Sequence, residues 1–337
     1  MLRFLRSLFG AGDEYSRYPE SLVRDLIERA VDATDPWLRA VSGYRKKLRP
    51  AVIRSLEHVT SMMEALPPAV PLCIGCYDEN PLLKAIFTSR DEMFAVLGND
   101  RNLKLFLQGT ETVLREVIAL LIMEKKENTI FGAEMTGDVV VRDVPQTTVS
   151  FVSHRFVDPA SNEAEARRLL GFRAYDRLIS LALRRITGMK VERKDLEGRR
   201  GMLQAKLDLL QRGGWGFEGD DSGRSSDMPG MEEEIGLINT RLGRLGGDDR
   251  MLEAYLDALI DVLGHPEQHL WGKKVTLILD SMRIKRSQLV ENSHELTLIE
   301  LENSAGRKLI LTLAAIPVNE IDGKQLTGFM TEVVLSD

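Results

Sequence analysis

A heptad-like spacing of apolar residues in two stretches constrains the fold of this chain more than any other feature. The seam residues follow one another in steps of four and three from Tyr175 to Leu210, and again from Met231 to Leu263. This alternation keeps apolar side chains on one side of a supercoiled helix. The segment between the stretches is rich in glycine and acid, which oppose a continuous helix. We therefore predict an antiparallel coiled-coil hairpin over residues 161–264, with a flexible acidic tip at residues 213–230.

Two further features support this pairing. Arg193 and Asp249 each interrupt one apolar seam, and the antiparallel register places them in one layer, where a paired polar defect fixes register at some cost in stability. Glu163–Arg200 carries eleven basic and six acidic residues, whereas the return stretch carries three and eight, so the arms have net charges of +5 and −5. Opposite charges favour this partner over self-pairing. The alternative is two unrelated amphipathic helices on a globular core, since the return stretch contains three helix-breaking glycines: Gly243, Gly246 and Gly247.

Composition narrows the class of protein. The chain has 337 residues, of which 43% are hydrophobic and 28% charged, enough for about two domains and an extension. Its net charge of −6 argues against a dedicated nucleic-acid binder, which concentrates uncompensated basic residues on one surface. No apolar run approaches the ~20 residues that a membrane-spanning helix needs. With only two cysteines, the sequence lacks a disulfide framework, and a reducing cytoplasm is the expected compartment.

Residues 1–12 form a short amphipathic segment. Its apolar side chains lie opposite Arg3 and Arg6, as in an interfacial membrane anchor: Leu2, Leu5, Leu8 and Phe9. Because so short a segment buries little area, it predicts at most weak, reversible association with a membrane surface. A frayed or self-packed N-terminus is the alternative.

The rest of the chain predicts an α+β protein. We expect a helical domain over residues 13–132, whose last helix covers Gly109–Lys126, and a β-ribbon over residues 133–160, where apolar and polar residues alternate. We predict a small antiparallel β domain over residues 265–337, either a sheet or a partly open barrel. Its strands can lie in one sheet with residues 147–157. The coiled-coil hairpin then projects as an insertion from this β-containing body.

Cys73 and Cys76 have the spacing of half a zinc site or of a dithiol redox motif. A closed zinc site needs four ligands, and the sequence has no second cysteine pair. The pair follows a proline-rich break rather than a strand-to-helix turn, so a structural role is favoured over metal binding or redox chemistry. His265 and His269 are spaced like paired ligands, but Pro266 spoils the helical face that aligns two rings. We predict no catalytic residue, no metal site and no cofactor.

Arg283 and Arg286, followed by a turn with Ser304 and Gly306, resemble the arginine-then-turn arrangement of small β-barrels that bind cyclic dinucleotides. The resemblance implies a nucleotide-responsive site. In this chain Glu302 stands two residues before the serine, and the glycine comes early. Basic residues that protect a sheet edge from aggregation are the other explanation of the same pattern.

The tip of the hairpin is the predicted partner-binding site. We expect Trp215, Phe217 and Met228 to anchor a partner, with acidic residues that steer it: Glu218, Asp220 and Asp221. A linker without a partner is the alternative. The sequence as a whole favours a non-catalytic cytoplasmic interaction or assembly protein whose partner is another protein or a second copy of the chain. An enzyme or nucleotide-responsive switch with a site between the helical and β domains, and a peripheral membrane protein, are the alternatives.

Overall fold

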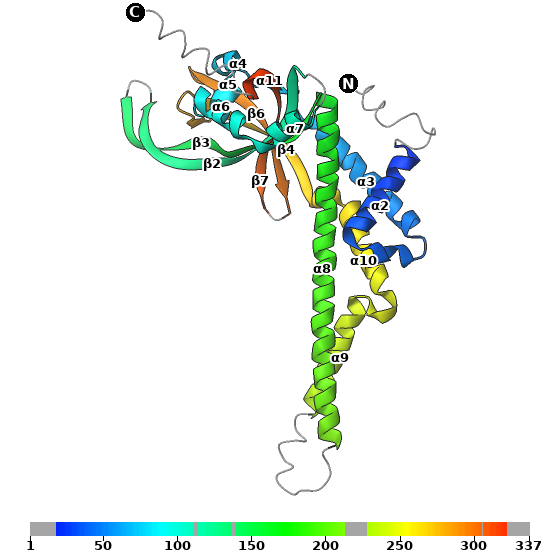
Figure 1. Ribbon diagram of the computed structural model, residues 1–337. Coiled ribbons are helices and arrows are strands. Elements are labelled where there is room, and N and C mark those ends of the chain that lie inside the picture. Colours follow the sequence, from blue (N-terminus) through cyan, green and yellow to red (C-terminus); the bar gives the residue numbers. More distant parts are fainter. Residues whose placement is uncertain (1–17, 111–113, 137–138, 213–227, 305, 322–337) are drawn as a thin grey trace, which may run out of the picture. The chain divides into compact units, whose positions relative to one another are not determined.

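The computed structural model describes residues 18–110, 114–136, 139–212, 228–304 and 306–321 (Figure 1). It combines helices with an antiparallel sheet, as the α+β class predicts. The chain forms two compact units, each built from two separate stretches. The first unit comprises Met1–Glu57 and Tyr175–Pro266, and the second comprises His58–Ala174 and Glu267–Asp337.

The first unit contains helices only among its described residues. Their bounds, with α3 and α8 continuing into the second unit, are α2 Glu20–Thr34, η1 Pro36–Ala40, α3 Tyr44–Ala65, α8 Glu163–Arg212, α9 Met228–Arg244 and α10 Gly247–Gly264. Asp35 caps η1, because its side chain accepts a hydrogen bond from the backbone N–H of Trp37 at 3.0 Å, and Pro36 occupies the first helical position. Both residue types are typical of the position that they occupy at the start of this helix.

Helices distant in the sequence are tied together inside this unit by buried hydrogen bonds. The hydroxyl of Ser55 on α3 donates to the carbonyl of Leu263 at the end of α10, at 2.6 Å. The hydroxyl of Tyr175 on α8 donates to the carbonyl of Leu26 on α2, at 3.0 Å. Burial raises the pKa of Tyr175 well above its ordinary range. These contacts fix α10 against α3 and α8 against α2.

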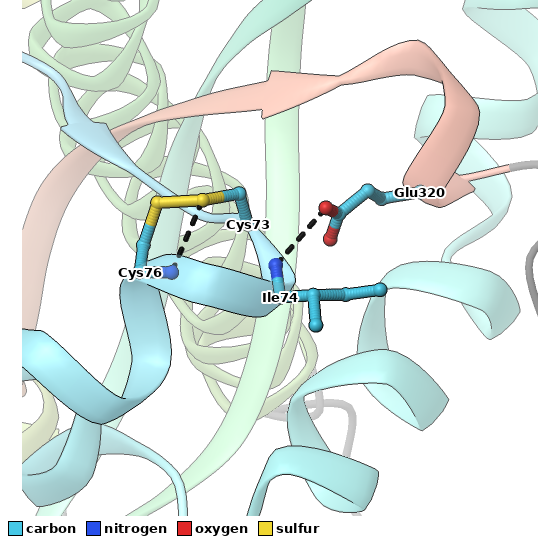
Figure 2. The surroundings of a disulfide bond; sticks show 4 residues. All are labelled: Cys73, Ile74, Cys76 and Glu320. Atoms are coloured by element: carbon cyan, nitrogen blue, oxygen red, sulfur yellow. Dashed lines mark hydrogen bonds between the residues drawn. A yellow bond between two sulfur atoms is a disulfide. The ribbon is translucent and has the colours of Figure 1, made fainter.

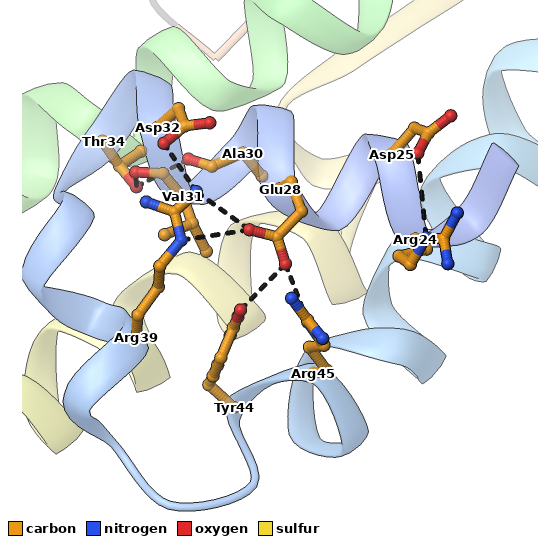
Figure 3. A network of polar contacts seen from close by, with 10 residues as sticks. All are labelled: Arg24, Asp25, Glu28, Ala30, Val31, Asp32, Thr34, Arg39, Tyr44 and Arg45. Carbon is orange, nitrogen blue, oxygen red and sulfur yellow. Dashed lines mark hydrogen bonds and ion pairs between the residues drawn. The ribbon is translucent and has the colours of Figure 1, made fainter. Parts of the chain in front are cut away.

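Glu28 binds three side chains at the surface of this unit (Figure 3). Its carboxylate accepts hydrogen bonds from the hydroxyl of Tyr44 and the guanidinium of Arg45 at 2.8 Å each, and from Arg39 at 2.8 and 3.1 Å. Burial alone raises the pKa of Glu28, but these hydrogen bonds outweigh it and hold the pKa at about 2. The carboxylate thereby joins α2 to η1 and to the first turn of α3.

The return stretch is two helices rather than one, which corrects the expectation of a continuous arm. Gly246 separates α9 from α10 with a φ of +105°. A Cβ on this residue would lie 2.8 Å from the Cβ of Ala254 and 2.9 Å from the carbonyl oxygen of Arg250. Only glycine adopts this backbone and fits this space without strain, so the break is fixed by the residue itself.

The second unit contains a seven-stranded sheet and short helices. Its strands are β1 Val70–Pro71, β2 Glu116–Thr136, β3 Val139–Ala160, β4 Leu270–Asp280, β5 Lys285–Arg286, β6 Ser293–Asn303 and β7 Lys308–Pro317. Its helices besides parts of α3 and α8 are α4 Ile74–Glu79, α5 Pro81–Ile86, α6 Arg90–Asn99, α7 Arg101–Gly109, η2 Pro266–Gln268 and α11 Val318–Ile321, with Pro266 itself assigned to the first unit.

The sheet has the strand order β3-β2-β7-β6-β4-β5, with antiparallel neighbours throughout, and β1 pairs in parallel with β7. Thr148 of β3 also bridges Ile284, which precedes β5. The first and last strands of the order therefore meet at one point, as in a partly open barrel. The strands after residue 265 share one sheet with residues 147–157, as the sequence analysis allows for.

The helix predicted over Gly109–Lys126 is wrong, because β2 begins at Glu116. All seven residues of Val117–Met123 are buried, so both faces of this central strand are covered. A strand buried on both faces has no alternation of polar and apolar residues, and a short apolar run of this kind has no period that distinguishes it from a buried helix. The helical domain expected over residues 13–132 therefore ends in a strand.

One face of the sheet and the short helices enclose the core of this unit. Residues from β2, β4, β6 and β7 pack with residues from α5, α6 and α7, among them Leu83, Met93, Leu97, Leu103 and Val117. In Figure 1 these helices and α11 gather at the sheet. The arrangement also brings the end of β1 and the end of β7 side by side, since the two strands run in the same direction.

Candidate interaction site on helix α8

Ion pairs join α8 to the two return helices in antiparallel order. Arg199 of α8 pairs with Glu234 of α9, Glu192 of α8 pairs with Arg241 of α9 at 2.6 Å, and Arg185 of α8 pairs with Asp261 of α10. As the residue number falls along α8, the number of the partner rises. The basic arm and the acidic arm therefore meet through pairs of opposite charge.

The seam positions of α8 lie on the covered side of the helix. Tyr175, Ile179, Ala182 and Ile186 are buried, and Arg193 in the same seam is only 7% exposed. The later seam positions are half-buried: Leu196, Arg200, Leu203, Leu207 and Leu210. The 4,3 spacing thus predicts correctly which side of α8 is covered.

The opposite side of α8 is exposed and partly apolar. Val191 is 55% exposed, Met202 71% and Leu209 72%. These residues lie eleven and seven positions apart, which are close to whole numbers of helical turns, so they form one line along the helix. Gly198 and Ala205 lie on the same line and are small enough for another helix to approach closely. We call Val191, Gly198, Met202, Ala205 and Leu209 the outer stripe.

Charged residues border the outer stripe on both sides. Helical geometry of 100° per residue places Lys194 and Asp208 along one border, and Asp195 and Lys206 along the other. All four residues are exposed. These four residues give each border one charge of each sign near opposite ends of the stripe, and Arg199 also lies beside the border of Asp195 and Lys206.

A hollow of about 540 Å³ lies between η1, α8 and α10. Lys190 places its ammonium 2.6 Å from the carboxylate of Asp35 and 5.4 Å from the ring centre of Tyr255, and burial raises the pKa of Tyr255. Trp37 stands at this hollow with 74% of its surface exposed. The hollow offers an aromatic contact, while the charges of Lys190 and Asp35 are satisfied by one another.

The structure reaches only part of the predicted partner-binding tip. Met228 is the first residue of α9 and is half-buried, whereas five predicted tip residues lie outside the described residues: Trp215, Phe217, Glu218, Asp220 and Asp221. The membrane-facing residues of the N-terminal segment also lie outside them: Leu2, Leu5, Leu8 and Phe9. These predictions stay untested.

The predicted register pair is described on one side only. Arg193 is buried and pairs with Glu197 one turn along α8, at 2.8 Å. Asp249 lies in the first turn of α10, but its side chain is outside the described part of the structure. The pairing of Arg193 with Asp249 stays a prediction.

Cys73 and Cys76 form a disulfide, with their Cα atoms 5.0 Å apart (Figure 2). The sequence argues against a strand-to-helix setting for this pair, and the structure corrects that point. β1 ends at Pro71 and α4 begins at Ile74, so the cysteines do lie between a strand and a helix. A strand of two residues after a proline-rich break has no sequence pattern of its own, which is why it escapes prediction.

The two arginines of the nucleotide resemblance contact the protein itself. Arg283 donates to the carbonyls of Lys84 and Phe87, at 3.0 and 2.6 Å, and Arg286 pairs with Asp280 at 2.7 Å. Arg283 has a φ of +61° in the turn before β5. These contacts assign both residues a role in holding the short strand β5 at the sheet edge.

The described residues hold no group of three or more metal-binding side chains. Within the same part of the chain, every helix is too short or too polar to cross a bilayer. Comparison with known proteins finds no family model, no curated protein and no solved structure that matches the chain. The geometry of the chain itself is thus what bears on function.

Sequence reasoning missed the outer stripe, although its signal is present. Residues 191, 198 and 205 repeat every seven positions, and so do residues 195, 202 and 209. The repeat contains two small residues and one aspartate, so it is much weaker in hydrophobicity than the buried seam. Only the exposed fractions show that its large apolar side chains are left uncovered.

Proposed function

We propose that the protein is a non-catalytic assembly protein, in which α8 with α9 and α10 forms an antiparallel coiled-coil arm and the outer stripe binds the same stripe of a second copy. The exposed line of Val191, Met202 and Leu209 carries this proposal. Contiguous exposed apolar residues on a soluble protein mark an interaction surface more often than isolated ones do. A helix with such a line of apolar residues on one face can bind another helix through that face.

The sizes of the side chains favour an antiparallel pairing of two α8 helices. If residue 200 lies on the twofold axis, Val191 of one copy faces Leu209 of the other, and Met202 faces Gly198. A large side chain then meets a small one at the centre, and two branched side chains meet at each end. Such a match of large with small residues permits close packing of helices.

The charges favour the same register. A twofold axis through residue 200 brings each border of the stripe against the same border of the second copy. Lys194 then lies close to Asp208 of the other copy, and Asp195 lies close to Lys206. Each contact occurs twice in the dimer because the interface is isologous. Arg199 approaches its own counterpart near the axis, but its charge is compensated by Glu234 of the same chain.

The first experiment measures the molar mass of the intact protein by light scattering after size-exclusion chromatography, over a range of concentrations. We expect a dimer that Met202→Glu dissociates, because two charges would be buried opposite Gly198. Each 1.4 kcal/mol of lost binding energy raises the Kd about tenfold, so we expect at least this factor. Leu237→Glu is the matched control, since Leu237 is 65% exposed on α9 and lies off the stripe.

A charge exchange tests the register separately from the hydrophobic contact. Lys194→Glu and Asp208→Lys are each expected to weaken the dimer, and the two together are expected to restore it, because the exchanged charges meet again across the axis. Circular dichroism confirms that every variant keeps its helices. A wild-type monomer at all concentrations, or no rescue by the double substitution, contradicts the proposal.

A further inference from the structure

We infer that Cys73 and Cys76 are a reversible thiol–disulfide exchange site, which reacts with an external dithiol and uses the carboxyl of Glu320 as a neighbouring proton carrier. The inference concerns the second unit and is independent of the assembly through α8. It starts from the topology of the sheet. β1 and β7 are parallel neighbours, with Val70 beside Ala314 and Pro71 beside Ala315. The segments that leave their carboxyl ends must therefore emerge together.

Those two segments carry the chemistry. β1 leads through Leu72 into the cysteine pair, and β7 leads directly into α11, which contains Glu320. The backbone N–H of Leu72 donates to the carbonyl of Ala315 at 2.8 Å and keeps the ends in register.

Glu320 contacts the cysteine loop itself (Figure 2). Its Oε1 accepts a hydrogen bond from the backbone N–H of Ile74, between the two cysteines, at 3.0 Å. Its Oε2 is buried and has no hydrogen-bond partner among the described residues. A carboxyl oxygen without a partner favours the protonated form, and burial raises the pKa of Glu320 accordingly. Glu320 thus places a carboxyl oxygen without a described hydrogen-bond partner against the loop that carries the two cysteines.

The disulfide is accessible to a reactant and contributes little to the stability of the fold. Both cysteines are half-buried rather than enclosed, and Gly75 between them is exposed, with open space where a side chain would stand. A bond that links residues three positions apart closes a very short loop, so it removes little conformational entropy from the unfolded chain. The sequence contains no third cysteine, so any exchange requires a thiol from outside the chain.

The reaction balances with a dithiol as the reductant. One thiolate of the dithiol attacks a sulfur of the pair, forming a mixed disulfide and breaking the Cys73–Cys76 bond. The released thiolate takes a proton, for which the carboxyl of Glu320 is the nearby source. The second thiol of the reductant then attacks the reductant's sulfur atom in the mixed disulfide and releases the remaining cysteine. The products are a cyclic disulfide and two cysteine thiols, with two electrons and two protons transferred.

The test uses the intact protein and dithiothreitol as the dithiol. Free thiols are alkylated at intervals and counted by mass, while thermal unfolding is recorded for the oxidised and reduced forms. We expect full reduction under native conditions, with both forms folded, and reduction several-fold slower in Glu320→Gln than in the wild type. Glu79→Gln is the control, since Glu79 is exposed at the end of α4, the helix that contains Cys76.

Two outcomes overturn the inference. Reduction that occurs only as fast as the protein unfolds, or a reduced form that is unfolded, assigns the disulfide a structural role. Equal reduction rates in the wild type and Glu320→Gln, with Glu320→Gln as stable as Glu79→Gln, remove the carboxyl from the exchange. If Glu320→Gln fails to fold, Glu320→Ala replaces it, and a rate equal to that of the wild type again contradicts the role of the carboxyl.

Discussion

Replacement of Glu28 by glutamine removes the negative charge that joins α2, η1 and α3 while keeping the size of the side chain (Figure 3). A fall in the pKa of Glu28 from 4.5 to about 2 corresponds to about 3.4 kcal/mol in the free energy of unfolding, if Glu28 and its partners were shielded from water. The side chain of Glu28 is 24% exposed, and those of Arg39 and Arg45 are 38% and 59% exposed. Solvent screening reduces the expected loss in Glu28→Gln to about 1–2 kcal/mol.

The pH dependence of this loss follows from the direction of the shift. The pKa of Glu28 is lower in the folded protein than in the unfolded chain, so its contribution is fully present above about pH 4.5 and disappears as the pH falls towards 2. We expect the free energy of unfolding, measured with urea, to differ between wild type and Glu28→Gln by about 1–2 kcal/mol at pH 7. The difference should shrink steadily as the pH falls below about 4.5.

A matched variant separates this effect from general loss of charge. Asp25 lies on the same helix, and its contact with Arg24 is long, at 3.9 Å between two exposed side chains. Asp25→Asn is therefore expected to change stability by less than about 0.5 kcal/mol. A difference between wild type and Glu28→Gln that is the same at pH 7 and pH 3, or no larger than that of Asp25→Asn, would refute the reasoning.

Two further changes probe how the first unit is held together. Gly246→Ala should cost about 1–3 kcal/mol in urea unfolding, because alanine is strained at a φ of +105° and its Cβ would meet Ala254 at 2.8 Å; an unchanged midpoint would show that the junction of α9 and α10 adapts freely. Ser55→Ala should cost about 1–2 kcal/mol and speed hydrogen exchange at the end of α10, because the carbonyl of Leu263 loses its buried donor. A stability equal to that of the wild type would mean that another donor replaces the hydroxyl.

The regular parts of this fold were predictable because local rules determine them. The 4,3 spacing predicts the covered side of α8, and the alternation of apolar and polar residues predicts the β-structure after residue 133 that β3 shows. In each case the pattern lies within a short stretch of sequence, so distant parts of the chain do not change the local structure that it predicts.

Other parts depend on what surrounds them. β2 resembles a helix in sequence because both of its faces are buried, and that depends on strands and helices far away in the chain. The three glycines of the return stretch indicate an interruption of the helix, but they do not show whether the helix bends or ends there. The approach of Glu320 to the cysteine loop arises from the parallel pairing of β1 with β7, residues some 240 positions apart. No local pattern contains that information.

The proposed antiparallel pairing of two α8 helices is tested most directly by the distance between identical spin labels on the two copies. Gly188 and Gly201 are suitable positions, because a Cβ at either lies in open space. Gly188→Cys and Gly201→Cys, each in a Cys73→Ser and Cys76→Ser background, place one nitroxide per chain. With a twofold axis at residue 200, a rise of 1.5 Å per residue and helix axes about 8–10 Å apart, we expect about 20 Å or less between labels at 201 and about 40 Å at 188. Similar short distances at both positions, or no measurable distance at either, would contradict the account.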